Sequence, residues 1–105
     1  MNDISLIGRF TSDPKITQNT DINSICICNF VLAIPRKIYR GEEPKCDFIN
    51  CSAYNHNARF VSSHFNKGDV IGITGFIKSS NYTDHKSGAE CTRLYVCVEH
   101  IHFTK

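Results

Sequence analysis

One short stretch of this sequence combines two aromatic rings with hydrogen-bonding side chains in a pattern that could hold a flat ligand. Residues 47–54 read D-F-I-N-C-S-A-Y. Because side chains of a β-strand alternate between two faces, Phe48 and Tyr54 would lie on the same face. Asn50 and Ser52 would lie between them on that face, open to solvent. This arrangement suits stacking on a flat, polar group; the alternative is that a loop or a subunit contact covers both rings.

The same combination of rings and polar or basic side chains recurs elsewhere in the chain. Lys78, Ser80 and Tyr82 alternate along a later β-type run, and Tyr39 lies in a segment rich in Lys and Arg. Aromatic rings stack on single-stranded bases of any sequence, and basic residues between them contact phosphates. The pattern therefore favours a single-stranded nucleic acid, whereas the net charge of +2 is too small to indicate one alone.

The elements that must position these residues are five strands and one short helix. The strands are expected over residues 4–10, 24–36, 47–54, 69–82 and 91–103, with the helix over 55–66 between the third and fourth strands. Gly72 and Gly75 are typical of a strand that bends sharply in a small barrel. This order predicts an all-β chain with one short helix, folded as a five-stranded OB-fold Greek-key barrel.

Details of the helix and of the last strand follow from the same patterns. Asn55 or Asn57 is expected to cap the helix, and Gly68 to terminate it. Leu94, Val96 and Val98 are expected to lie on one face of the last strand.

Length and composition predict one domain over residues 1–105 with a single core. No apolar run approaches the roughly 20 residues needed to cross a bilayer, and the N-terminus does not resemble a signal peptide. We therefore expect a cytoplasmic protein without a membrane partner.

The cysteines and histidines do not predict a metal site, a cofactor or catalysis. Cys26 and Cys28 are badly spaced for a disulfide on one strand, and no C-x-x-C pair is present. His100 and His102 would share a strand face but have no obvious third ligand. Cys51 would face the core, and no nucleophile–base–orienter set is present, so we expect a protein that is not an enzyme.

Almost the whole sequence resembles the bacterial and phage single-stranded DNA-binding protein family. The matching motifs are L-I-G-R-F-T-S-D-P at 6–14, F-V-L-A-I-P-R at 30–36, D-F-I-N-C at 47–51, K-G-D-V-I-G-I-T-G at 67–75 and N-Y-T-D at 81–84. The resemblance implies coating of single-stranded DNA without sequence specificity during replication, recombination and repair. It also implies a homo-oligomer, a tetramer by the family pattern, with a dimer left open.

The resemblance carries the family's DNA contacts onto particular positions. Its stacking rings fall on Phe48, Tyr54 and Tyr82, and a further ring falls on Ile38 or Tyr39 according to the alignment of that loop. Together with the strand pattern, it predicts the following DNA-binding residues: Arg36, Ile38, Tyr39, Phe48, Asn50, Tyr54, Lys67, Lys78 and Tyr82. The chain has no Trp, so we expect weaker stacking per base than the family's tryptophans provide.

The family's usual C-terminal tail, rich in Gly, Gln and Pro with an acidic tip, does not follow Lys105. Either the tail has been trimmed from this sequence or the protein is a tail-less form, and in both cases we do not expect this chain to recruit partner proteins through a tail. The alternative within the same fold is a primosomal replication protein, a dimeric adaptor that assembles partner proteins.

Overall fold

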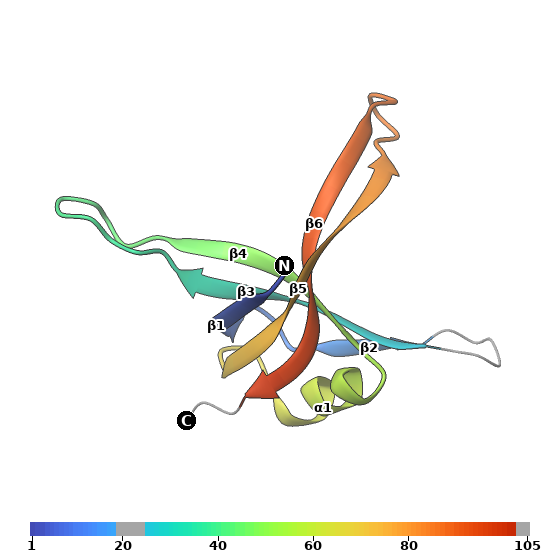
Figure 1. The fold of residues 1–105 in the computed structure, drawn as a ribbon, viewed down its shortest axis with the longest axis horizontal. Helices are drawn as coiled ribbons and strands as arrows, with labels where there is room; N and C mark the ends of the chain where they lie inside the picture. The colour runs from blue at the N-terminus through green and yellow to red at the C-terminus, as the bar shows by residue number, and fades with distance from the viewer. Residues whose placement is uncertain (19–24, 103–105) are drawn as a thin grey trace.

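The computed structural model describes residues 1–18 and 25–102, which form a β-barrel with one helix at its base (Figure 1). Its elements are β1 (Ile4–Phe10), β2 (Lys15–Gln18), β3 (Cys26–Pro35), β4 (Cys46–Tyr54), α1 (His56–His64), β5 (Val70–Thr83) and β6 (Glu90–His102). The five predicted strands are β1 and β3 to β6, and the helix lies between β4 and β5 as expected. The short strand β2 is an addition to the five. The expected strand ends at residues 24 and 103 lie outside the described residues.

The strands close into a barrel because β1 pairs with two partners. The sheet order is β1-β5-β6-β4-β3-β2, and an additional β1–β3 pairing joins its two sides. Closure brings β1 very near β3: a Cβ added at Gly8 would lie 3.0 Å from the carbonyl oxygen of Ala33. Strands β4 and β6 are parallel neighbours, whereas the other pairs are antiparallel. These pairings confirm the predicted barrel.

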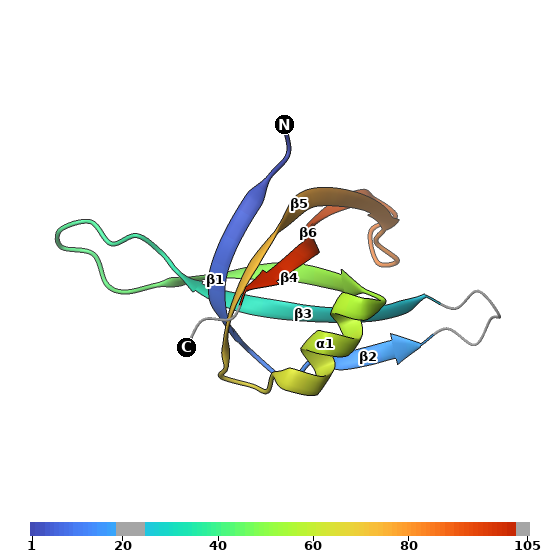
Figure 2. The same cartoon turned by 60° about the horizontal axis from the view of Figure 1, so that its bottom comes forward.

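The core fills the barrel and extends under α1, which covers one end (Figure 2). Leu32 of β3 and Ile71 of β5 are fully buried, and Ala58 and Val61 reach the same cluster from α1. Burial of such side chains contributes about 1.5–3 kcal/mol each in transfer free energy. It therefore anchors the strands that carry the exposed aromatic residues.

The helix is shorter than predicted, and its ends differ from the expectation. Asn55 occupies the N-cap position but makes no side-chain cap hydrogen bond. Its Oδ1 accepts instead from the backbone N–H of Cys26 at 3.3 Å, which ties the end of β4 to β3. Gly68 does not end the helix, which stops at His64; with φ at 90° it forms the turn before β5.

Two long hairpins project from the barrel as separate arms (Figure 1). One joins β3 to β4, and the other joins β5 to β6. The second arm begins beyond a bulge between Thr74 and Gly75, as the two glycines of that strand predicted. A Cβ at Gly75 would collide with the carbonyl oxygen of Cys97, so only glycine permits β6 to pass so close.

Candidate nucleic-acid interface

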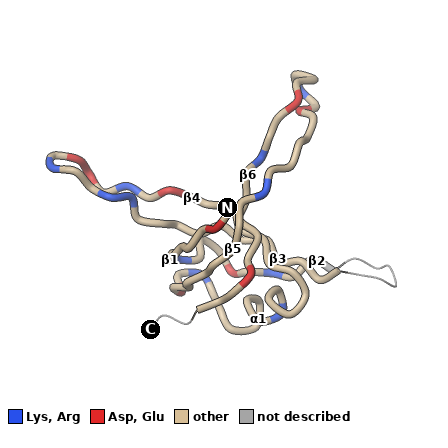
Figure 3. The backbone as a smooth tube through the Cα atoms, viewed as in Figure 1, with Lys and Arg blue, Asp and Glu red and all other residues tan. Residues whose placement is uncertain are grey.

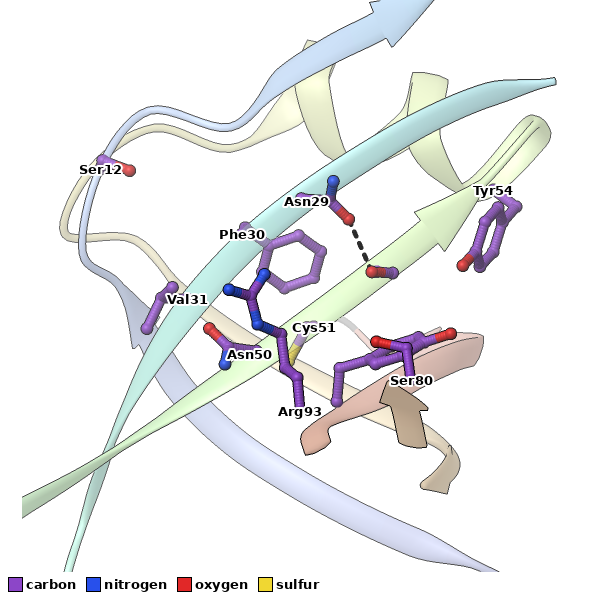
Figure 4. Close-up of a pocket in the computed structure, with 11 residues that line it drawn as sticks. Ser12, Asn29, Phe30, Val31, Asn50, Cys51, Tyr54, Ser80 and Arg93 are labelled. Atoms are coloured by element: carbon purple, nitrogen blue, oxygen red, sulfur yellow. Dashed lines mark hydrogen bonds between the residues drawn. The ribbon is translucent and has the colours of Figure 1, made fainter. Parts of the chain in front are cut away.

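A polar groove of about 400 Å³ runs between β3 and β4 on one side and the base of the β5–β6 hairpin on the other (Figure 4). Its walls include Asn29, Asn50, Tyr54, Ser80, Arg93 and Tyr95. Two of these, Asn50 and Tyr54, were predicted as ligand-binding residues. The groove therefore lies on the face of β4 where the sequence placed the site.

Strand β4 has the predicted alternation, with one correction. Phe48 and Asn50 are exposed, whereas Cys51 is buried at 2% exposure. Ser52 was expected in solvent and is instead buried, at 8% exposure. It lies opposite Asn29 of β3 and also beside β6, and its hydroxyl donates to Asn29 Oδ1 at 2.6 Å. A strand flanked on both sides leaves little room for solvent at its centre.

Tyr54 stands half-buried at the end of β4, with its ring directed to the groove (Figure 4). Burial, together with the neighbouring Cys97 and Tyr95 side chains, raises the pKa of its hydroxyl to about 12. The hydroxyl is therefore neutral at physiological pH. A neutral ring fixed in a groove provides a stacking surface that carries no charge to repel a phosphate.

Phe48 lies beside the groove rather than in it. With Ile4, Ile77 and Leu94 it lines an adjacent apolar hollow of about 280 Å³. Leu94 was predicted to share one face with Val96 and Val98; those two are buried, whereas Leu94 is 62% exposed. The side of β6 that faces the core near Val96 faces solvent at Leu94, because the hairpin has left the barrel there.

The β5–β6 hairpin places the predicted Lys78 and Tyr82 on one face. Its register sets Lys78 opposite Tyr95 and Ser80 opposite Arg93. The Arg93 guanidinium carbon lies 5.3 Å from the centroid of the Tyr82 ring, within the range of a cation–π contact. One face of this hairpin thus continues the polar groove with alternating basic and aromatic side chains.

The sequence reasoning missed Arg93 and Tyr95. The predicted strand ends at residues 82 and 91, if paired with each other, would have set Tyr82 opposite Cys91 and hence Ser80 opposite Arg93, which is the observed register. This signal was present but depends on the cross-strand register.

The β3–β4 hairpin carries the predicted Arg36, Ile38 and Tyr39, all exposed. Arg36 is paired with a carboxylate: its Nη2 donates to Asp47 Oδ1 at 2.5 Å and its Nε to Asp47 Oδ2 at 3.3 Å. These hydrogen bonds and the charge of its partner lower the pKa of Asp47 and raise that of Arg36. The Asp47 carboxylate therefore competes with a phosphate for Arg36.

Lys and Arg residues occur along both hairpins, where the backbone is coloured blue in Figure 3. Lys67 belongs to neither. It precedes β5, where its backbone N–H donates to Asp13 Oδ1 at 2.7 Å, at the other end of that strand from Tyr82. The fold therefore gathers Asn50, Tyr54, Lys78 and Tyr82 near one groove and separates them from Lys67.

The remaining chemistry-bearing residues form no further cluster in the described part of the chain. Among residues 1–18 and 25–102, no group of three His, Cys, Asp or Glu side chains could hold a metal ion. His102 contacts Thr74, with Nε2 2.5 Å from Oγ1, and all six cysteines are free thiols. No helix in the described segments is long and apolar enough to cross a membrane.

Comparisons with known proteins agree with this geometry. The model of the "Single-strand binding protein family" matches residues 1–104. The chain is 31% identical over 104 residues to a single-stranded DNA-binding protein of Halalkalibacterium halodurans, covering 98% of this chain and 60% of that protein. It is 33% identical over 96 residues to single-stranded DNA-binding protein 2 of Clostridium acetobutylicum, covering 91% and 68%.

A third relative, single-stranded DNA-binding protein 1 of Synechocystis, is 29% identical over 101 residues, covering 96% of this chain and 81% of that protein. The chain spans 60% and 54% of the lengths of the Halalkalibacterium and Bacillus cereus relatives. The names of these relatives do not favour the adaptor alternative.

Proposed function

Because the chain belongs to the single-strand binding protein family, we propose that it binds and coats single-stranded DNA without requiring a particular sequence. The observation that carries this proposal is the polar groove, in which Tyr54 and Asn50 of β4 face Ser80 and Arg93 of the β5–β6 hairpin. The role is binding rather than catalysis. Exposed single strands arise in the cytoplasm of bacteria during replication, recombination and repair, which are the processes we propose it serves.

Stacking supplies the affinity that does not depend on sequence. Tyr54 lines the polar groove, Tyr82 is exposed on the hairpin above it, and Phe48 is exposed at 67% on the same strand as Tyr54. Each stacked base contributes about 1–3 kcal/mol, and every base has a π-face. Asn50, between the two rings of β4, offers hydrogen bonds to a base edge.

Phosphate contacts come from the basic side chains beside these rings. Lys78 is exposed on the face of β5 that carries Tyr82. Arg36 joins them only if a phosphate displaces Asp47, and Ile38 and Tyr39 extend the path along the β3–β4 hairpin. Lys67 belongs to this path only if the strand continues past the start of β5. Each phosphate neutralised would add about 0.7 to the slope of log affinity against log salt concentration for a single strand.

We further propose that the chain acts as a homo-oligomer, a tetramer on the family pattern, with a dimer as the smaller possibility. Its support is the outer face of β1, where Ile7 is 60% exposed beside an apolar groove that includes Leu6 and Ile73. A second copy would cover this surface and leave the polar groove open. Multi-angle light scattering measures the mass, and a monomeric mass at micromolar concentration would contradict the oligomer.

The test of DNA binding is a titration of fluorescently labelled oligo(dT) at two salt concentrations, with an equal-length duplex as control. We expect tight binding to the single strand, weak binding to the duplex and an affinity that falls as salt rises. Equal affinity for both forms would reject the coating function. The exposed rings would then be reassigned to protein contacts.

A further inference from the structure

Arg93 adds charged hydrogen-bond donors to the polar groove, which stacking on aromatic rings does not require. Its guanidinium lies over the Tyr82 ring at 5.3 Å. Within residues 1–18 and 25–102 the one ion pair joins Arg36 to Asp47, so no carboxylate of these segments neutralises Arg93. The N–H donors of a guanidinium lie in its plane. A guanidinium stacked on a ring therefore directs them past the edge of that ring.

The opposite wall of the groove carries two amide side chains, Asn29 and Asn50. The Asn29 amide oxygen accepts from Ser52 at 2.6 Å, so the Asn29 NH₂ group points away from Ser52 (Figure 4). The Asn50 amide and the Arg93 guanidinium are directed to the same part of the groove in this view. A ligand held between these side chains would be matched best if it presented two adjacent acceptors.

On the edge that carries N7 in the purines, guanine alone among the four DNA bases presents two adjacent acceptors, N7 and O6. Cytosine presents such a pair only on its Watson–Crick edge, as N3 and O2. Adenine places its N6 amino donor beside N7, thymine offers its O4 carbonyl beside a methyl group, and cytosine offers only its N4 amino donor there. Arginine forms a bidentate pair with N7 and O6 because its donors are fixed in a planar fork. The volume of about 400 Å³ is at the small end of ligand sites, which suits a single nucleotide.

We propose that the polar groove is a guanine-preferring subsite, in which Arg93 pairs with N7 and O6 of a base stacked beside Tyr54 and Asn50 closes the other side. This inference rests on the proposed binding of single-stranded DNA and adds base selectivity to it. The rest of the path, through Phe48 and Tyr82, accepts any base, so guanine adds affinity without being required.

The test measures fluorescence anisotropy of the full chain with labelled oligonucleotides of equal length on a thymine background. One strand is thymine throughout, and the others carry guanine, adenine or 7-deazaguanine at every third position. Isolated guanines do not form guanine tracts, and 7-deazaguanine lacks only the N7 acceptor. We expect the guanine strand to bind about fivefold tighter or more than the thymine strand, and most of this gain to disappear with 7-deazaguanine or adenine.

Variants separate base recognition from charge. Arg93→Lys keeps the positive charge but loses the bidentate fork, so the guanine-to-thymine affinity ratio should fall close to one. Arg59→Lys, the same exchange at an exposed site on α1, should keep the ratio of the parent chain. Equal binding of the thymine and guanine strands by the parent chain, or a ratio that survives Arg93→Lys, would overturn the subsite alone. Failure to bind any of the strands would overturn the proposed function as well.

Discussion

The two hairpins that project from the barrel both carry arginine and tyrosine, but they use them differently. In the β3–β4 hairpin, Arg36 is held by Asp47 at 2.5 Å, and Tyr39 lies exposed in the loop. In the β5–β6 hairpin, Arg93 lies over Tyr82 and borders a groove. The first hairpin has the denser basic sequence, and its Arg40 is also exposed, but the arginine that lines the polar groove belongs to the second. The number of basic residues in a hairpin therefore does not tell which of them border the groove.

Electrostatics explains why the Arg36–Asp47 pair persists under ordinary conditions. The hydrogen bond from Arg36 lowers the pKa of Asp47, so both groups are charged at neutral pH. A carboxyl group with a lowered folded-state pKa stabilises the fold above its unfolded-state pKa, and loses that contribution as pH falls through the lowered value. The pair is therefore present throughout the neutral range, where it competes with phosphate. Because both groups are exposed, salt also screens it.

The largest expected effect is on stability. It should come from disturbing the bend of β5 where the β5–β6 hairpin leaves the barrel. Gly75→Ala places a methyl group against the carbonyl oxygen of Cys97, so the backbone must shift. We expect the free energy of unfolding to fall by about 1–3 kcal/mol, measured by urea denaturation. Ser79→Ala, on an exposed position of the same strand, should change it by less than about 0.5 kcal/mol. An unchanged midpoint for Gly75→Ala would mean that the hairpin does not need this close approach.

Replacing the tyrosine of each hairpin compares the two arms directly. Tyr82→Ala removes a stacking ring and the surface that holds Arg93, so oligo(dT) affinity should fall by about fivefold to 150-fold. Tyr39→Ala removes an exposed ring from a loop away from the polar groove, and a smaller loss is expected. Anisotropy titrations of both variants test the order. A larger loss for Tyr39→Ala would place the main DNA path on the β3–β4 hairpin.

Salt dependence sharpens the comparison for the lysines. If Lys78 neutralises one phosphate, Lys78→Gln should reduce the slope of log affinity against log salt by about 0.7. Lys67→Gln is the matched control, because Lys67 lies at the opposite end of β5. We expect it to leave the slope unchanged. Equal reductions for both variants would show that the DNA path extends past the start of β5.

The smallest effect on DNA affinity is expected from releasing Arg36 from its ion pair with Asp47. Asp47→Asn removes the competing carboxylate, so oligo(dT) affinity at low salt should rise by about twofold. Glu42→Gln makes the same change of charge in the loop, where no ion pair is broken, and controls for general repulsion. The gain should vanish in the double variant Asp47→Asn/Arg36→Gln. A gain that persists in the double variant would mean that Arg36 contributes nothing once it is released.

The amino-acid sequence by itself determined the barrel and part of the candidate site. Alternation along β4 placed Asn50 and Tyr54 on the ligand side and Cys51 in the core, because side-chain direction on a strand has a strict period of two. The glycines of β5 marked its bend for the same local reason. The short range of these rules explains their success: each depends on a few neighbouring residues.

Only the tertiary structure decided which residues share a surface, because contacts across strands depend on register and on where each strand leaves the barrel. Ser52 is buried since β4 is flanked there by both β3 and β6, and Leu94 is exposed since its hairpin has already passed the rim. The pairing of Arg36 with Asp47, and the placement of Arg93 over Tyr82, follow from the same long-range packing. Alternation fixes the face of a side chain, whereas its partner depends on the neighbouring strand.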